Sequence, residues 1–226
     1  MSRGNRLASL EASLQRRFRV VETTVQVAHR SLSILHPASA EDLINEIDFD
    51  RDERLPYWAE LWPSSRTLAE QVLARHGEGR SLLELGCGSG LVSTCASIAG
   101  FAVVASDYYE DALRFAEVNS WRNKAPVPRS LLLDWRHVPS DLERFDVVIA
   151  SDVLYERPYG QLVAGAIDAS LGDDGVAFLA DPGRVGRDDF LRAIVPLGLI
   201  VANRQDLPFE DGAIRQTISI FEVRRR

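Results

Sequence analysis

The chain contains little cysteine, no long apolar run and no excess of positive charge. Its 226 residues include two cysteines, Cys87 and Cys95, which are too few for a disulfide framework, and no His/Cys cluster indicates a metal site. No apolar stretch is long enough to span a bilayer, and the first residues lack an apolar signal core, so we expect a cytoplasmic protein without membrane attachment. The net charge of -7 disfavours binding to long stretches of nucleic-acid backbone.

The length fits one α/β domain preceded by an N-terminal extension. Residues 1–17 predict a polar, frayed helix. Alternating apolar and polar residues over 21–35 predict a β-hairpin, and residues 41–46 predict a short capped helix. We therefore divide the chain into an extension of residues 1–54 and a larger domain of residues 55–226.

The most informative stretch is the sequence SLLELGCGSG at residues 81–90. A short apolar strand carries Glu84 and runs directly into glycines at alternate positions, which let the backbone approach a ligand closely. A dinucleotide-binding fingerprint would need glycine or alanine where Leu91 stands, and the Gly-Lys-Ser/Thr of a P-loop is missing. The spacing therefore indicates another kind of nucleotide-cofactor loop. Its glycines are Gly86, Gly88 and Gly90, with Cys87 between the first two.

Polar residues also stand where the next predicted strands end. Residues 101–106 are followed by Asp107, residues 130–133 by Asp134 and Trp135, and residues 145–150 by Ser151 and Asp152. In open α/β sheets, ligands bind at the carboxyl ends of the strands, so these residues are expected at one site. The alternation of strands and helices predicts an α/β, Rossmann-like sheet of seven mostly parallel strands flanked by helices. Residues 199–202 and 217–223 should form an antiparallel edge hairpin.

The acidic-x-Gly-x-Gly-x-Gly spacing and the strand ends that follow it resemble class I S-adenosylmethionine-dependent methyltransferases, the seven-β-strand enzymes. The resemblance implies S-adenosyl-L-methionine as the cofactor, contacted by the loop and by polar strand ends: Glu84, Gly86, Cys87, Gly88, Gly90, Asp107, Asp134, Trp135 and Ser151. Asp107 would accept both ribose hydroxyls, since it follows the loop by about twenty residues. Asp134 and Trp135 would hold the adenine.

Shorter motifs resemble one branch, the family-16 methyltransferases, many of which methylate protein lysines. They are the Trp62-Pro63 element ahead of a helix and the Asp-x-x-Tyr formed by Asp152 and Tyr155. The Asp-Pro-Gly-Arg at residues 181–184 is similar to that of lysine methyltransferases acting on the electron-transfer flavoprotein β subunit. The resemblance implies that Trp62 packs on the cofactor and that Asp152 and Tyr155 lie at the methylation site.

A lysine amine must lose its proton before it attacks a methyl group, and its ordinary pKa is about 10.4. A narrow channel walled by Tyr155 would desolvate the amine and lower its pKa. Asp152 would orient the amine and accept a hydrogen bond from it. We therefore expect a protein substrate that presents a lysine, with neither a metal nor a nucleic acid taking part.

Other interpretations stay open at this point. Asp107 and Asp152 are typical helix-cap residues, and Trp135 and Tyr155 also fit as ordinary core and rim aromatics. A small-molecule methyltransferase, or a cofactor-binding protein without catalytic activity, would carry the same glycine loop. Adenine-amine methyltransferases are disfavoured, because their Asp/Asn-Pro-Pro-Tyr motif is replaced by Ser-Asp-Val-Leu at residues 151–154.

Overall fold

The computed structural model describes residues 3–40, residue 43 and residues 56–226. The helices are α1 (Arg3–Arg17), η2 (Tyr57–Ala59), α3 (Pro63–Leu73), α4 (Leu91–Ile98), α5 (Glu110–Arg122), η3 (Trp135–His137), α6 (Arg157–Ser170) and α7 (Arg187–Ala193). The strands are β1 (Val20–Val27), β2 (Arg30–Pro37), β3 (Ser81–Leu85), β4 (Ala102–Asp107), β5 (Arg129–Leu132), β6 (Phe145–Ser151), β7 (Leu171–Asp181), β8 (Leu199–Asp211) and β9 (Ile214–Arg225).

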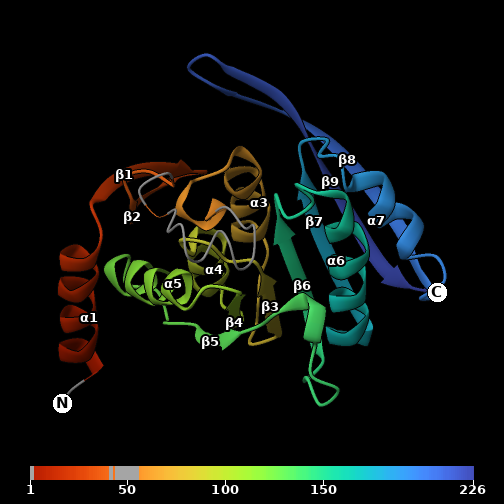
Figure 1. Cartoon of the computed structure of the whole chain (residues 1–226), viewed down its shortest axis with the longest axis horizontal. Helices are drawn as coiled ribbons and strands as arrows, with labels where there is room; N and C mark the ends of the chain where they lie inside the picture. The colour runs from red at the N-terminus through yellow and green to blue at the C-terminus, as the bar shows by residue number, and fades with distance from the viewer. Residues whose placement is uncertain (1–2, 41–42, 44–55) are drawn as a thin grey trace.

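The predicted seven-stranded sheet is confirmed. Its strand order is β5-β4-β3-β6-β7-β9-β8 (Figure 1). The first five strands in this order are parallel, and β9 runs antiparallel to both of its neighbours, β7 and β8. The antiparallel edge hairpin expected from the sequence is therefore present, with β9 inserted between β7 and β8.

Helices cover both faces of the sheet, and a separate apolar core lies on each face. Alternate residues of one strand enter different cores, as Leu82 and Leu83 of β3 do. On one face the strands pack against α3 and α4, through side chains such as Val72 and Cys95. On the other face they pack against α6 and α7, through Ile167 and Phe190. These two cores make the sheet the buried middle layer of a three-layer fold.

The strands of the edge hairpin are longer than the sequence predicts. They cover residues 199–211 and 214–225, and residues 214–218 of β9 are paired with β8 but not with β7. Figure 1 shows this part of the hairpin extending past the sheet. This part is mostly exposed, but Leu207 and Phe209 of β8 pack against the core on the α3 side of the sheet, and Arg66 of α3 contacts the Phe209 ring. Residues 172–175 lie within β7, beside a register shift of β7 against β6.

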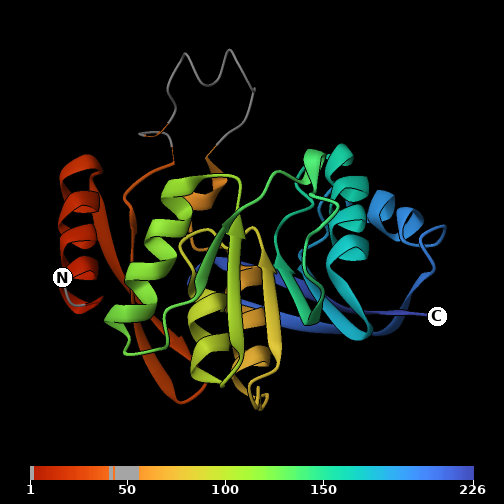
Figure 2. The same cartoon turned by 90° about the horizontal axis from the view of Figure 1, so that it is seen from below.

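The N-terminal extension packs against the larger domain. The predicted hairpin is confirmed, with β1 and β2 antiparallel from the Val20–Pro37 pair to the Val27–Arg30 pair. Helix α1 also forms, and it lies along α5 (Figure 2). Its Leu14 is fully buried in a small core with residues of β2 and α5, so the polar helix expected from the sequence has an apolar side.

Some expectations lie outside the described residues, namely the short helix at 41–46 and the domain boundary after residue 54. Within the described residues, no helix is long and apolar enough to cross a membrane. Both cysteines, Cys87 and Cys95, are buried as free thiols.

Candidate functional site

A cavity lies at the carboxyl ends of the parallel strands. It encloses about 910 Å³ of space, a figure that includes the open solvent at its mouth. All but two of the predicted site residues line it: Trp62, Gly86, Cys87, Gly88, Asp107, Asp134, Trp135, Ser151, Asp152 and Tyr155. The parallel sheet therefore brings together side chains that are up to 93 positions apart, from Trp62 to Tyr155.

The glycine loop needs glycine for both conformation and space. Gly86 has a φ of 72° and Gly88 a φ of 51°, in the left-handed region that favours glycine. A Cβ on Gly86 would lie 3.1 Å from the Val153 side chain, and one on Gly88 would lie 3.1 Å from the Trp58 carbonyl oxygen. Cys87 lies between them, and burial raises the pKa of its thiol, so it lines the cavity as a neutral group.

Two residues predicted to contact the cofactor, Glu84 and Gly90, are not among the residues that line the cavity. Glu84 is buried beneath the loop, where its carboxyl group accepts a short hydrogen bond from the Ser93 hydroxyl, and burial raises its pKa to about 8. Gly90 has a φ of 81°, and a Cβ there would lie 2.5 Å from Ala116 of α5. Gly90 therefore lets two helices approach each other, and both residues support the loop from below.

Asp107 joins the glycine loop to the end of β4. Its carboxylate accepts hydrogen bonds from the backbone N–H groups of Gly88 and Tyr109, each at 3.0 Å. Burial nevertheless raises its pKa to about 6. The carboxylate lines the cavity, so its remaining acceptor capacity faces any ligand bound there.

The next strand end contributes Asp134 and Trp135. The Asp134 carboxylate accepts hydrogen bonds from the backbone and the guanidinium of Arg136, which lowers its pKa. The Trp135 ring lies beside Gly86 and meets Tyr159 edge-on at 5.9 Å between ring centroids. The buried Trp135 Nε1 has no hydrogen-bond partner in the described part of the chain, so a donor beside the cavity is left unsatisfied.

Asp152 is held by two partners that the sequence did not indicate. The Ser64 hydroxyl donates to Oδ2 at 3.0 Å, and Arg184 Nε donates to Oδ1 at 2.6 Å. The Asp152 side chain is only 2% exposed, and its φ of 58° is unusual for a residue other than glycine. Asp181 orients Arg184 by accepting its backbone N–H, and the guanidinium lies 5.0 Å from the centroid of the Trp62 ring.

Three tyrosines form an aromatic wall at this end of the cavity. The Tyr155 ring lies 4.9 Å from that of Tyr57 and 4.4 Å from that of Tyr159, between centroids. Burial raises the pKa of Tyr155, so its hydroxyl stays protonated and acts as a hydrogen-bond donor rather than a base. Tyr57 and Tyr159 were missed at the sequence level, although both lie within a few residues of the Trp62 and Tyr155 motifs.

The cavity fits an adenosine-containing cofactor with an amino-acid end. A carboxylate at the end of β4 suits ribose hydroxyls, and Leu133 with Trp135 offers an apolar surface for a base. The glycine loop presents backbone without side chains. Among the described residues, no group of three or more His, Cys, Asp or Glu side chains could hold a metal ion.

Residues 57–215, more than half of the chain, match a protein family described as the methyltransferase domain. The chain belongs to the S-adenosylmethionine-dependent methyltransferases. This membership confirms the predicted family and its cofactor. The match begins at Tyr57, so the hairpin and helix α1 of this methyltransferase lie outside it.

Curated relatives cover part of the methyltransferase. It is 29% identical over 139 residues to the electron transfer flavoprotein beta subunit lysine methyltransferase of Danio rerio, covering 59% of this chain and 53% of that protein. It is 32% identical over 117 residues to the protein-lysine methyltransferase METTL21E of Mus musculus, covering 46% of this chain and 47% of that protein. The chain thus spans about half the length of these relatives.

Solved structures share the fold of the methyltransferase. One is magnesium protoporphyrin IX methyltransferase (ChlM) from Synechocystis PCC 6803 with bound SAM, at a TM-score of 0.59 and 20% identity. The similarity covers 82% of this chain and 94% of that chain, which supports the seven-stranded architecture.

We predict that Asp107→Ala weakens S-adenosylmethionine binding by about 1.5–3 kcal/mol, the range for hydrogen bonds to a charged group. Isothermal titration calorimetry measures this change. Asp146→Ala is the matched control. Asp146 also accepts a backbone N–H across the sheet, from Ser81, but it lies at the start of β6, away from the cavity at the carboxyl ends of the strands. Equal cofactor affinity in the two variants would show that Asp107 does not contact the cofactor.

We predict that Glu84 makes the folded state less stable as pH rises. Its pKa is about 8 in the folded protein, against an ordinary value of 4.5, so between these values the folded state retains a proton that the unfolded chain has lost. The free energy of unfolding should fall by up to about 1.4 kcal/mol per pH unit in this window. In urea unfolding between pH 5 and 9, the free energy of unfolding of Glu84→Gln should change less with pH than that of the unaltered protein. This holds even if the substitution shifts the free energy by a constant amount at every pH. If the free energy of unfolding changed with pH by the same amount in both proteins, the Glu84 carboxyl group would not be the cause of the pH dependence.

Proposed function

We propose that the protein transfers a methyl group from S-adenosylmethionine to the side-chain amine of a lysine in a protein partner. The observation that carries this proposal is the convergence of three separate segments at one end of the cavity. Asp152 bonds both Ser64 and Arg184, and the Arg184 guanidinium lies over the Trp62 ring. Trp62, Asp152 and Tyr155 line the cavity together. The lysine methyltransferase names of the two curated relatives support the same substrate class.

The aromatic wall favours the neutral form of an amine. Transfer from water to a site lined by Tyr57, Tyr155 and Tyr159 desolvates the cation and lowers the amine pKa. The protonated Tyr155 hydroxyl does not accept the proton, so the proton leaves to solvent. The same rings hold the amine in place, and positioning of this kind lowers reaction barriers by up to about 7–11 kcal/mol.

Asp152 and Arg184 act as a pair. An isolated carboxylate beside the amine would favour the ammonium form, which does not react. The Arg184 guanidinium, 2.6 Å from Asp152, offsets that charge and leaves a dipole that orients the amine. Ser64 fixes the second carboxylate oxygen, so the pair has one geometry.

S-adenosylmethionine, when bound, supplies the methyl group on a positively charged sulfur. Asp107 and the glycine loop are proposed to hold its ribose and amino-acid ends, and Trp135 its adenine. Trp62 and Ser151 complete the wall between the cofactor and the amine.

The substrate class is tested by incubating the purified protein with methyl-labelled S-adenosylmethionine and cell extract. We expect label in a protein band and methyllysine by mass spectrometry. Because the chain contains a single lysine, Lys124, a Lys124→Arg variant removes self-labelling as an explanation. Asp152→Ala should lower turnover by about one to three orders of magnitude without changing cofactor affinity, because it removes the group that orients the amine. Label found only on metabolites would replace the protein substrate by a small molecule, and no label despite cofactor binding would indicate a catalytically silent protein.

We predict that Arg184→Met moves the acidic limb of the pH–rate profile upward by about one unit, because the unpaired Asp152 carboxylate then favours the ammonium form. Cofactor affinity should stay constant. Arg187→Met is the matched control, since Arg187 is about as exposed as Arg184 but pairs with Asp188. An unchanged profile in Arg184→Met, with normal turnover, would rule out the pair as a determinant of amine protonation.

A further inference from the structure

Asn119 of helix α5 connects the N-terminal extension to the glycine loop. Its side chain is fully buried, and its amide makes three hydrogen bonds at 2.8 Å. Oδ1 accepts the backbone N–H of Leu35 in β2, and Nδ2 donates to the Leu35 carbonyl oxygen. Nδ2 also donates to the carbonyl oxygen of Ser89, which lies between Gly88 and Gly90 and lines the cavity.

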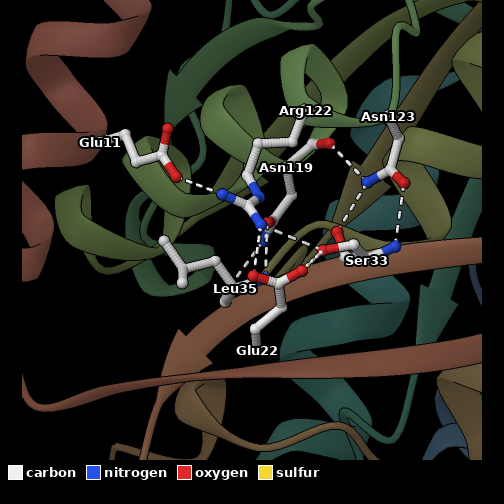
Figure 3. Close-up of polar contacts among 7 residues, drawn as sticks. All are labelled: Glu11, Glu22, Ser33, Leu35, Asn119, Arg122 and Asn123. Carbon is white, nitrogen blue, oxygen red and sulfur yellow. Dashed lines mark hydrogen bonds and ion pairs between the residues drawn. The ribbon is translucent and has the colours of Figure 1, made fainter.

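Asn123, one helical turn further along α5, makes a similar contact without reaching the loop. Its Oδ1 accepts the backbone N–H of Ser33 at 3.0 Å, and its Nδ2 donates to the Ser33 carbonyl oxygen at 2.8 Å (Figure 3). Its remaining bond is to the Asn119 carbonyl oxygen, within α5. The two amides therefore hold β2 in the same way, and of the pair Asn119 alone also bonds the glycine loop.

Trp58 provides a second connection to Ser89. Its carbonyl oxygen accepts the Ser89 hydroxyl at 3.4 Å. Its ring packs 6.3 Å from Phe18, which follows α1, and 5.7 Å from Phe115 of α5, between centroids. Trp58 also lines the cavity, so the core beneath the extension continues into the wall of the cofactor site.

An amide is the side chain that this position requires. It donates and accepts at once, whereas a carboxylate would face two carbonyl oxygens and an apolar side chain would leave three buried backbone groups unpaired. Buried backbone groups without partners are costly, so the loop, β2 and Asn119 favour one common arrangement.

We propose that Asn119 is a positioning residue that couples docking of the extension, residues 3–37, to the cofactor-binding conformation of the glycine loop. The coupling is reciprocal. The docked extension raises the affinity for S-adenosylmethionine, and bound S-adenosylmethionine stabilises the docked position of the extension. This role is independent of the methyl acceptor, because it acts through Ser89 on cofactor binding.

The test compares Asn119→Ala with Asn123→Ala. Both should lower the free energy of unfolding, measured in urea, because both release β2. In calorimetric titrations, Asn119→Ala should raise the Kd for S-adenosylmethionine about tenfold, while Asn123→Ala should change it by less than about twofold. An equal change in both variants, or none in Asn119→Ala, would overturn the proposal.

Hydrogen exchange of the unaltered protein tests the reverse direction and does not depend on a variant that folds. Saturating S-adenosylmethionine should slow exchange of the Leu35 amide, which bonds Asn119, more than exchange of the Val25 amide on the partner strand β1. Asn119→Asp, which retains the acceptor but not the two donated bonds, should lose this protection. Unchanged Leu35 exchange on cofactor addition would contradict the coupling.

Discussion

The parallel pairing of β3 with β4 and with β6 is the constraint on which the cavity depends. Leu85 at the end of β3 is in register with Ser106 of β4 and with Ala150 of β6. The residues that follow these three therefore come side by side, and they are Gly86, Asp107 and Ser151. The same pairing continues outward, because Ser151 is in register with Ala180 of β7. Asp152 and the Asp181-Pro-Gly-Arg184 turn meet for this reason.

Four buried carboxyl groups lie at or beneath these strand ends, and three of them, Glu84, Asp107 and Asp152, are accommodated in different ways. Glu84 accepts a hydrogen bond from the Ser93 hydroxyl, and burial raises its pKa to about 8. This rise is larger than that of Asp107, whose pKa is raised to about 6. Asp107 receives backbone N–H groups, which favour its charged form and partly oppose desolvation. Asp152 has a guanidinium partner. The charge environment therefore changes along the cavity, from neutral support under the loop to an ion pair at the end proposed for the amine.

The fold and the cofactor side were predictable from the sequence because their signals are local. A short apolar run followed by a polar residue marks a strand end, and glycines at positions 86, 88 and 90 mark a loop with φ above zero. The burial of α1 also had a local signal, since Leu7 and Leu14 lie two helical turns apart on one side. The outer part of the edge hairpin had a weaker signal, because its apolar Leu207 and Phe209, which pack against the core, stand among charged residues of strands paired with each other.

The partners of the site residues could not be predicted, because they depend on register and packing between distant segments. Arg184 is part of a motif visible in the sequence and Ser64 follows the Trp62-Pro63 element, but only the alignment of β6 with β7 and the placement of α3 bring both to Asp152. Asn119 is a polar residue in an amphipathic helix, a pattern typical of solvent exposure. Its burial follows from the docking of β2, whose backbone offers the groups that satisfy it.

One end of the cavity is formed mainly by backbone and the other by side chains. This difference determines which substitutions could change substrate specificity. The cofactor end consists mainly of backbone, held by Asp107 and by Asn119 through Ser89, so most substitutions there disturb the loop itself. The opposite end is lined by side chains from separate segments, such as Tyr57, Tyr155 and Asp152, and Arg184 bonds Asp152. Side chains such as Tyr155 and Arg184 can be exchanged without moving the glycine loop, because they follow strands β6 and β7, whose ends are fixed by the sheet. Under the proposed function, we therefore expect specificity for the methyl acceptor to depend on contacts between loops, and cofactor binding to depend on the sheet and on the glycine loop that follows β3.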